Sequence, residues 1–183
     1  MTNLFQYVNM FSGYLILIGL SVVGLLIIFS SVLKDTSKVL KSAIQSTSIV
    51  LFFINIIIFL FAMRLITFYT GQFTSGSDVM SFIPMIVLSF LYIIRVTLEF
   101  RNSAPRTKKG RNLKEVSSDI FKANMSYVVN TSVIFLLVIS PMFFLGNGTL
   151  NGLFIRLFVS VLIIALTYIF LFPKVFNIFI KDS

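Results

Sequence analysis

Five long apolar stretches alternate with short polar connections along the chain. They extend over residues 11–33, 48–69, 79–98, 126–145 and 153–172. A transmembrane helix needs about 20 mostly apolar residues to cross a hydrocarbon core of about 30 Å, and each stretch reaches that length. The pattern therefore predicts an all-α fold, in which residues 1–183 form a single membrane domain, a polytopic transmembrane helix bundle of about five spans.

The connections between these stretches alternate between basic ones and ones without Lys or Arg. The connection at 34–41 has three lysines, the one at 101–122 has seven Lys and Arg residues, and the tail adds two lysines. The connections at 71–78 and 146–152 contain neither. Because Lys and Arg accumulate in cytoplasmic loops, we predict that the N-terminus lies outside and the C-terminus lies in the cytoplasm.

The composition supports a membrane environment. Of the residues, 57% are hydrophobic and 11% are charged, whereas a soluble domain has about 25% charged residues. A surface so poor in charge cannot have water as its main solvent, so lipid must cover much of the chain. Abundant Ile, Phe, Asn and Lys are typical of an AT-rich genome, and we expect an integral protein of a bacterial plasma membrane.

Two segments next to the spans leave alternatives open. The second half of the basic loop at 101–125 places Leu113, Val116 and Ile120 on one face at helical spacing. This spacing predicts either a short amphipathic helix on the cytoplasmic surface or an inward extension of the fourth span. The apolar run also continues beyond the fifth span, so residues 173–183 either extend the last helix inward or lie along the membrane.

The basic loop between the third and fourth spans is the strongest local signal. Its cluster consists of Arg101, Arg106, Lys108, Lys109, Arg111 and Lys114. Clusters of this size just inside a span bind anionic lipid head groups, with about 1 kcal/mol from each cation. The same charges would also be present if they only fixed the topology, or if they met an acidic patch on a partner protein. No aromatic residue interrupts the cluster to stack on bases, so we do not expect nucleic acid as a partner.

Arg64 and Arg156 lie within the predicted outer parts of the second and fifth spans. The preference for cations on the inner side disfavours them there, which makes them a candidate site. They would hold an anion or a lipid phosphate, or form an ion pair with Asp78 at the start of the third span. The alternative is that each arginine snorkels to the head groups, which lie within reach of its side chain.

Three further features of the spans have both a structural and a functional interpretation. Arg95 and Glu99 are spaced i, i+4, which predicts a local ion pair or one end of a gate. Asn55 is expected either to make a packing hydrogen bond or to line a polar path. Pro141 removes a backbone hydrogen bond within the fourth span, so we predict a kink there and consider Pro141 a candidate hinge.

The tyrosines lie near the ends of the predicted spans. Since the chain contains no Trp, they are the residues available for the aromatic belts at the two membrane surfaces. Tyr92, Tyr127 and Tyr168 are predicted to contribute to the inner belt.

The sequence lacks the groups on which most enzymes depend. It contains no Cys and no His, which excludes thiol chemistry, histidine metal ligands and histidine proton relays. No Asp or Glu lies deep within a span, and neither a phosphate-binding loop nor a dinucleotide motif is present. We therefore expect no catalytic residues, no metal site, no cofactor and no enzymatic activity.

Two functions are compatible with these observations. The first is a non-enzymatic subunit of a larger membrane assembly, such as a transport, secretion or channel complex. Its partners would be other membrane subunits and membrane lipids, including anionic head groups at the inner face. The second is a channel or facilitator for a small or anionic solute, formed by self-association. In that case Arg64, Arg156, Asn55 and Pro141 would line or gate the path.

Overall fold

A computed structural model gives the fold of the chain. It describes the backbone of residues 2–34, 38–70, 75–107, 113–145 and 148–181. Side chains are described for residues 13–34, 38–69, 80–103, 115–144 and 150–180.

The described residues form helices joined by short connections, and no strand occurs among them. The elements are α1 (Thr2–Val32), α2 (Lys38–Thr70), α3 (Ser75–Thr107), α4 (Leu113–Ile139), α5 (Pro141–Leu145), α6 (Gly148–Leu166), the π-helix η1 (Thr167–Leu171) and α7 (Phe172–Lys181). They contain five helices that are long and apolar enough to cross a membrane. The predicted all-α transmembrane bundle of five spans is therefore confirmed.

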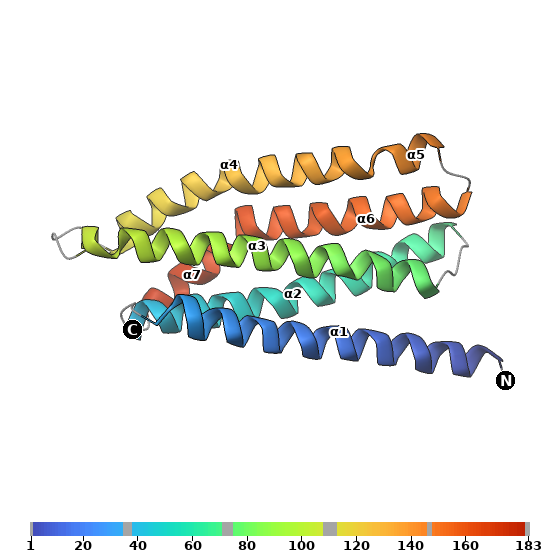
Figure 1. The fold of residues 1–183 in the computed structure, drawn as a ribbon, viewed down its shortest axis with the longest axis horizontal. Helices are drawn as coiled ribbons and strands as arrows, with labels where there is room; N and C mark the ends of the chain where they lie inside the picture. Colours follow the sequence, from blue (N-terminus) through green and yellow to red (C-terminus); the bar gives the residue numbers. More distant parts are fainter. Residues whose placement is uncertain (1, 35–37, 71–74, 108–112, 146–147, 182–183) are drawn as a thin grey trace.

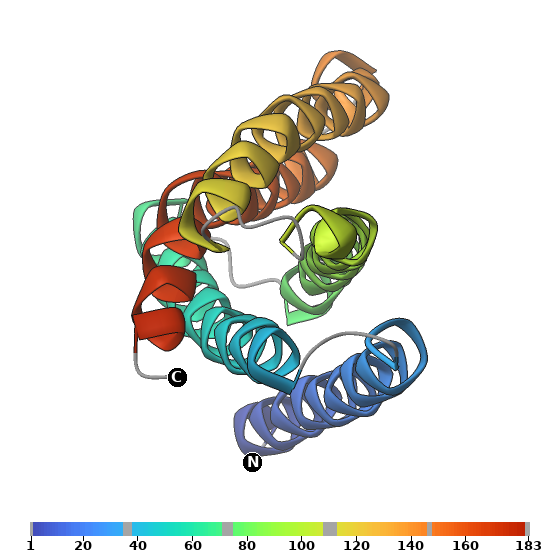
Figure 2. The ribbon, with the colours of Figure 1, turned by 90° about the vertical axis from the view of Figure 1, so that its left-hand side faces the viewer.

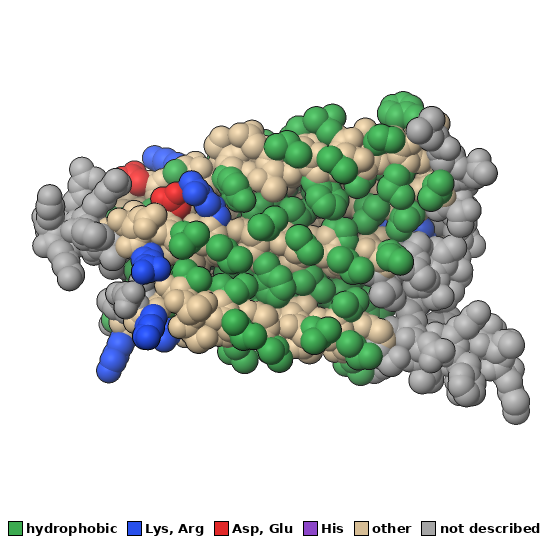
Figure 3. Space-filling model, viewed as in Figure 1, with side chains coloured by type: hydrophobic (Ala, Val, Ile, Leu, Met, Phe, Trp, Pro, Cys, Tyr) green, Lys and Arg blue, Asp and Glu red, His purple; other side chains and the backbone are tan. Residues whose placement is uncertain are grey.

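The five spans run side by side in alternating directions, and the two chain termini lie at opposite ends of the bundle (Figures 1 and 2). Most Lys and Arg side chains gather at one end (Figure 3), which we call the basic end. There α1, α3 and α7 end, and α2 and α4 begin. The opposite end is called the far end. The orientation of the bundle in the membrane stays a prediction, because it depends on the loop charges alone.

Helix α3 occupies the centre of the bundle. It packs most closely against α6 and also against α1, α4 and α2. Half of its membrane-spanning stretch is buried, compared with 17% for the stretches of α1 and α4. The core around it consists mainly of large aromatic and aliphatic side chains, among them the fully buried Phe59, Phe82 and Met85. Helices α1 and α4 are therefore peripheral.

The helices are longer than the predicted apolar stretches, and this resolves both open alternatives. Residues 113–122 extend the fourth span at the basic end, because α4 is continuous from Leu113 to Ile139. The last span likewise continues through η1 into α7, which ends at Lys181. Helix α7 bends away from the line of α6 and packs against α2 (Figure 1).

The predicted ion pair of Arg95 and Glu99 is confirmed at the basic end of α3. The Arg95 Nη2 atom lies 2.7 Å from the Glu99 Oε1 atom. The Arg95 guanidinium also lies 5.5 Å from the centre of the Tyr127 ring, a distance suitable for a cation–π contact. Arg95 thus links α3 to α4.

The predicted kink at Pro141 is a break between α4 and α5. Helix α4 ends at Ile139, and Pro141 occupies the first position of α5, where its missing N–H is tolerated. The carbonyl of Leu137, which a residue with an N–H at position 141 would have paired, accepts a hydrogen bond from Ser140 Oγ at 2.8 Å. The side chain of Ser140 therefore stabilises the break. Movement about Pro141 stays a prediction.

We predict that Ser140→Ala destabilises the bundle by about 0.6 kcal/mol, a typical value for a side-chain hydrogen bond in a membrane protein. The matched control is Ser30→Ala. Ser30 Oγ donates to the Ile27 carbonyl at 2.9 Å, but that carbonyl lies in the continuous helix α1 and also has its backbone partner. Reversible unfolding in mixed micelles measures both variants. An equal loss in the two variants would contradict the role of Ser140 as a cap.

Candidate functional site

The residues of the predicted outer site lie in different surroundings. Arg64 is exposed on α2, whereas Arg156 on α6 is 1% exposed and belongs to the largest fully buried side chains. Asp78 lies on α3, and its side chain is outside the described part of the structure. Snorkelling to the head groups is thus compatible with the position of Arg64, but it does not apply to Arg156. A joint anion or ion-pair site stays a prediction.

Arg156 lies within the bundle, about 12 Å along α6 from its first residue at 1.5 Å per residue. Its Nη1 atom donates a hydrogen bond to the Gly152 carbonyl at 3.1 Å. Ser160 Oγ donates to the carbonyl of Arg156 at 2.7 Å. A charged side chain within a membrane-spanning helix is costly and usually faces the interior of a bundle. Arg156 is therefore part of the core of this protein.

The predicted basic cluster lies on both sides of the connection between α3 and α4. Arg101 is exposed on α3. Arg106 and Lys114 lie on α3 and α4, and their side chains are not described. Lys108, Lys109 and Arg111 lie outside the described residues. The binding of lipid head groups by this cluster stays a prediction.

Two tyrosines assigned to the inner aromatic belt lie in the core instead. Tyr92 is fully buried, and its Oη atom shares a hydrogen bond with Ser132 Oγ at 2.7 Å. Tyr168 is 6% exposed and donates to the Ser89 carbonyl at 3.3 Å. The belt prediction was wrong for both, because these side chains lie on the buried faces of their helices. Their hydroxyl groups connect α3 to α4 and to η1.

Asn55 is the least satisfied polar side chain of the described core. It is fully buried, and neither its amide nitrogen nor its amide oxygen has a hydrogen-bond partner among the described residues. An unpaired buried amide costs about 1–3 kcal/mol on the scale derived from protein mutants. The predicted packing hydrogen bond is not observed among the described residues. The unpaired amide therefore favours the other interpretation, in which Asn55 lines a polar path.

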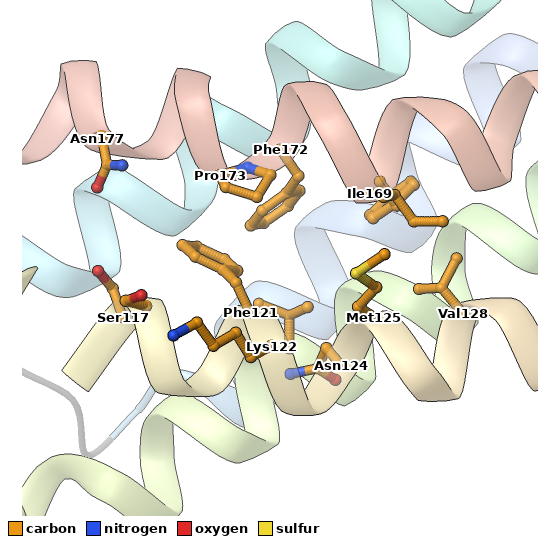
Figure 4. A pocket seen from close by; sticks show the side chains of 13 residues that line it. Ser117, Phe121, Lys122, Asn124, Met125, Val128, Ile169, Phe172, Pro173 and Asn177 are labelled. Atoms are coloured by element: carbon orange, nitrogen blue, oxygen red, sulfur yellow. The ribbon is translucent and has the colours of Figure 1, made fainter. Parts of the chain in front are cut away.

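A pocket of about 370 Å³ lies at the basic end, between α4 and the last helix. Its lining is Val96, Ser117, Ser118, Phe121, Lys122, Asn124, Met125, Val128, Tyr168, Ile169, Phe172, Pro173 and Asn177. Figure 4 shows that Phe121, Met125 and Val128 point from α4 toward the last helix. Sequence reasoning missed this pocket. Pro173 was a signal of irregular backbone, but the π-helix before it has no pattern that could be recognised.

The polar groups of the pocket can bind a ligand. Among the described residues, no group of three or more Asp and Glu side chains lies together in a way that would hold a metal ion. The polar groups of the pocket are hydroxyls, amides and one ammonium group. Such groups recognise a ligand through hydrogen bonds and charge.

We predict that Arg156→Ala destabilises the bundle by about 3 kcal/mol, because truncating a large buried side chain removes its contacts and leaves a cavity. Arg64→Ala is the matched control and is expected to change stability by less than about 0.5 kcal/mol, as for other exposed sites. The free energy of unfolding in mixed micelles measures both. Equal effects would contradict the buried position of Arg156.

We also predict an energetic coupling between Tyr92 and Ser132. Tyr92→Phe and Ser132→Ala each remove one partner of the same hydrogen bond, so the double variant should be less destabilised than the sum of the single variants. The expected difference is about 0.6 kcal/mol and at most about 1.7 kcal/mol. A double-mutant cycle on unfolding measures it. Strict additivity would exclude the bond.

The chain matches no protein-family model, no curated protein and no solved structure. The five apolar helices are those of an integral membrane protein. Within them lie a buried arginine, a buried and unpaired asparagine, and a pocket with a polar rim.

Proposed function

We propose that this protein is a non-enzymatic subunit of a larger assembly in a bacterial plasma membrane, such as a transport, secretion or channel complex. The proposal rests on Asn130, whose side chain is exposed on the outward side of the peripheral helix α4. Neighbouring outward residues on the same helix are large and apolar, including Val133, Ile134 and Val138. A polar amide among them is poorly placed against lipid.

The depth of Asn130 supports a partner helix. Asn130 lies eight residues after Lys122 on α4, or about 12 Å deeper at 1.5 Å per residue. A short amide at that position cannot extend to the head groups as a long lysine side chain does. In membranes such groups form hydrogen bonds between helices. A second membrane subunit would supply the hydrogen-bonding group that lipid cannot offer to Asn130.

Helix α1 offers a second surface for contact. Its main neighbour is α3, and it lies at the edge of the bundle (Figure 2). Gly24 is turned inward, where an added Cβ would lie 3.1 Å from Phe90. Gly19 is exposed, and an added Cβ there would have no atom within 4 Å. Small residues of this kind let the backbones of two membrane helices approach closely.

A self-assembled channel for a small or anionic solute is the second candidate. Asn55 favours it, because an unpaired amide in the core is the type of group that lines a hydrated path. Arg156 lies within the same bundle and would add a positive charge for an anion. In this alternative the second copy of the chain would take the place of the different subunit.

We predict that the protein, purified from its native host in a mild detergent, carries different membrane chains in a fixed ratio. Asn130→Leu should lower their amount about threefold, since it deletes an interhelical hydrogen bond of about 0.6 kcal/mol. Val138→Leu is the matched control on the same helix, because Val138 is 72% exposed and apolar, and it should leave the ratio unchanged. Quantitative mass spectrometry measures the ratio.

Two results would contradict the subunit proposal. One is a homo-oligomer that contains this chain alone and conducts anions in liposomes, which would support the channel. The other is an unchanged ratio in the Asn130→Leu variant. Gly19→Phe tests the α1 surface separately, by the same ratio of co-purified chains. It adds bulk where the structure has open space.

A further inference from the structure

The last helix widens and bends beside the pocket at the basic end. In η1 the N–H of Phe172 donates to the carbonyl of Thr167, five residues earlier, so this turn is wider than an α-helical turn. Pro173 follows directly and has no N–H to donate. Helix α7 then turns toward α2, whereas α4 continues on its own line (Figures 1 and 2). The pocket lies where these two helices diverge.

The lining of the pocket changes from polar to apolar with depth. On α4, four of the five lining residues from 117 to 124 are polar, the exception being Phe121, and the apolar Met125 and Val128 lie deeper. The last helix shows the same order from the basic end, with Asn177 before Phe172, Ile169 and Tyr168. From residue 117 to residue 128 the pocket wall extends about 16 Å at 1.5 Å per residue. A polar mouth above an apolar slot suits an amphiphilic molecule with a polar head group and an apolar chain.

The charge at the mouth is positive. Lys122 is exposed, and Figure 4 shows its side chain extended along α4 toward Ser117. The acidic residues of the same helix, Glu115 and Asp119, are exposed and do not belong to the lining of the pocket. Basic pockets between membrane helices bind the head groups of anionic lipids. The charge therefore selects a negative head group over a zwitterionic one.

Asn124 adds a second, independent feature. It is 5% exposed, and its Nδ2 atom donates to the Ile120 carbonyl at 2.9 Å. Its Oδ1 atom is buried and has no hydrogen-bond partner among the described residues. A buried acceptor of this kind requires a donor. Because the atom has almost no accessible surface in this conformation, a head-group hydroxyl reaches it once the Asn124 amide turns toward the pocket. The unpaired atom thus indicates a ligand that carries an O–H as well as a negative charge.

We propose that this pocket binds one anionic phospholipid with a hydroxylated head group from the leaflet at the basic end. Lys122 binds the phosphate, Asn124 Oδ1 accepts a hydrogen bond from a head-group hydroxyl, and an acyl chain lies between Met125 and Ile169. The site is distinct from the basic cluster of the connection between α3 and α4. It does not depend on whether the protein acts as a subunit or as a channel.

Native mass spectrometry of the full-length protein tests the site. The probes are phosphatidylglycerol and phosphatidylcholine with identical acyl chains, titrated into the detergent-purified protein. Phosphatidylglycerol should bind more tightly. Lys122→Gln should weaken its binding about fivefold, as expected for one cation near an anionic head group. The loss for phosphatidylcholine should be smaller, because the choline cation already offsets the charge of its phosphate. The matched control is Lys174→Gln, an exposed lysine on α7 that is not part of the lining, with an expected change below about twofold.

Two further variants test the acyl slot. Met125→Trp and Ile169→Phe fill the space between α4 and the last helix, and each should reduce the binding of both lipids. Thermal unfolding establishes that each variant is folded. If one of these variants is not folded, the lipid binding of the other variant tests the slot.

The position of the lipid is read by photo-crosslinking. A phosphatidylglycerol with a diazirine in its acyl chain should label peptides that contain residues 117–128 and 168–177. Equal affinity for the two lipids, equal effects of Lys122→Gln and Lys174→Gln, or labelling confined to other helices would each overturn the proposal. Labelling that persists at full strength in both slot-filling variants would do the same.

Discussion

Lipid offers no hydrogen-bond partners, so every polar group within the hydrocarbon layer depends on a partner inside the protein. The buried hydroxyl groups of Thr47, Ser48 and Ser89 have no hydrogen-bond partner among the described residues. Other hydroxyl side chains of the bundle meet the demand locally, by donating to the carbonyl four residues earlier. Four of them do so over 2.6 to 2.8 Å: Ser21, Thr97, Ser160 and Thr167. The helices can then pack by shape around α3. The amides of Asn55, Asn124 and Asn130 differ from this rule, because each is incompletely paired or turned outward.

The irregular part of the last helix follows from the same demand. A proline within a helix removes one N–H and crowds the carbonyl one turn earlier. The wide turn of η1 ends at Leu171, and Phe172 alone separates it from Pro173, so the backbone is already widened where the ring needs room. Thr167 supports this turn twice, since its Oγ1 atom donates to Ile163 and its carbonyl accepts from Phe172. The bend that results directs α7 to α2 and opens the space beside α4.

Hydropathy predicted the fold because it depends on position along the chain alone. The five spans and the Arg95–Glu99 pair, with its i, i+4 spacing, belong to this class. Which face of a helix is buried was much harder to predict. In a soluble protein the polar face marks the outside, but a helix surrounded by lipid is apolar on all sides. The sequence therefore could not separate the buried Arg156 from the exposed Arg64, or place Tyr92 in the core.

Helix α4 carries both asparagines on which the functional proposals rest, Asn124 and Asn130. The geometry of the helix places them on different faces. Asn124 and Asn130 are six residues apart, which corresponds to about 9 Å along the axis and roughly 120° around it. Asn124 is buried beside the last helix, whereas Asn130 is exposed on the outer side. A partner helix against Asn130 would therefore leave the mouth of the pocket open. Lipid binding and subunit contact can occur on one helix at the same time, because they use different faces and different depths.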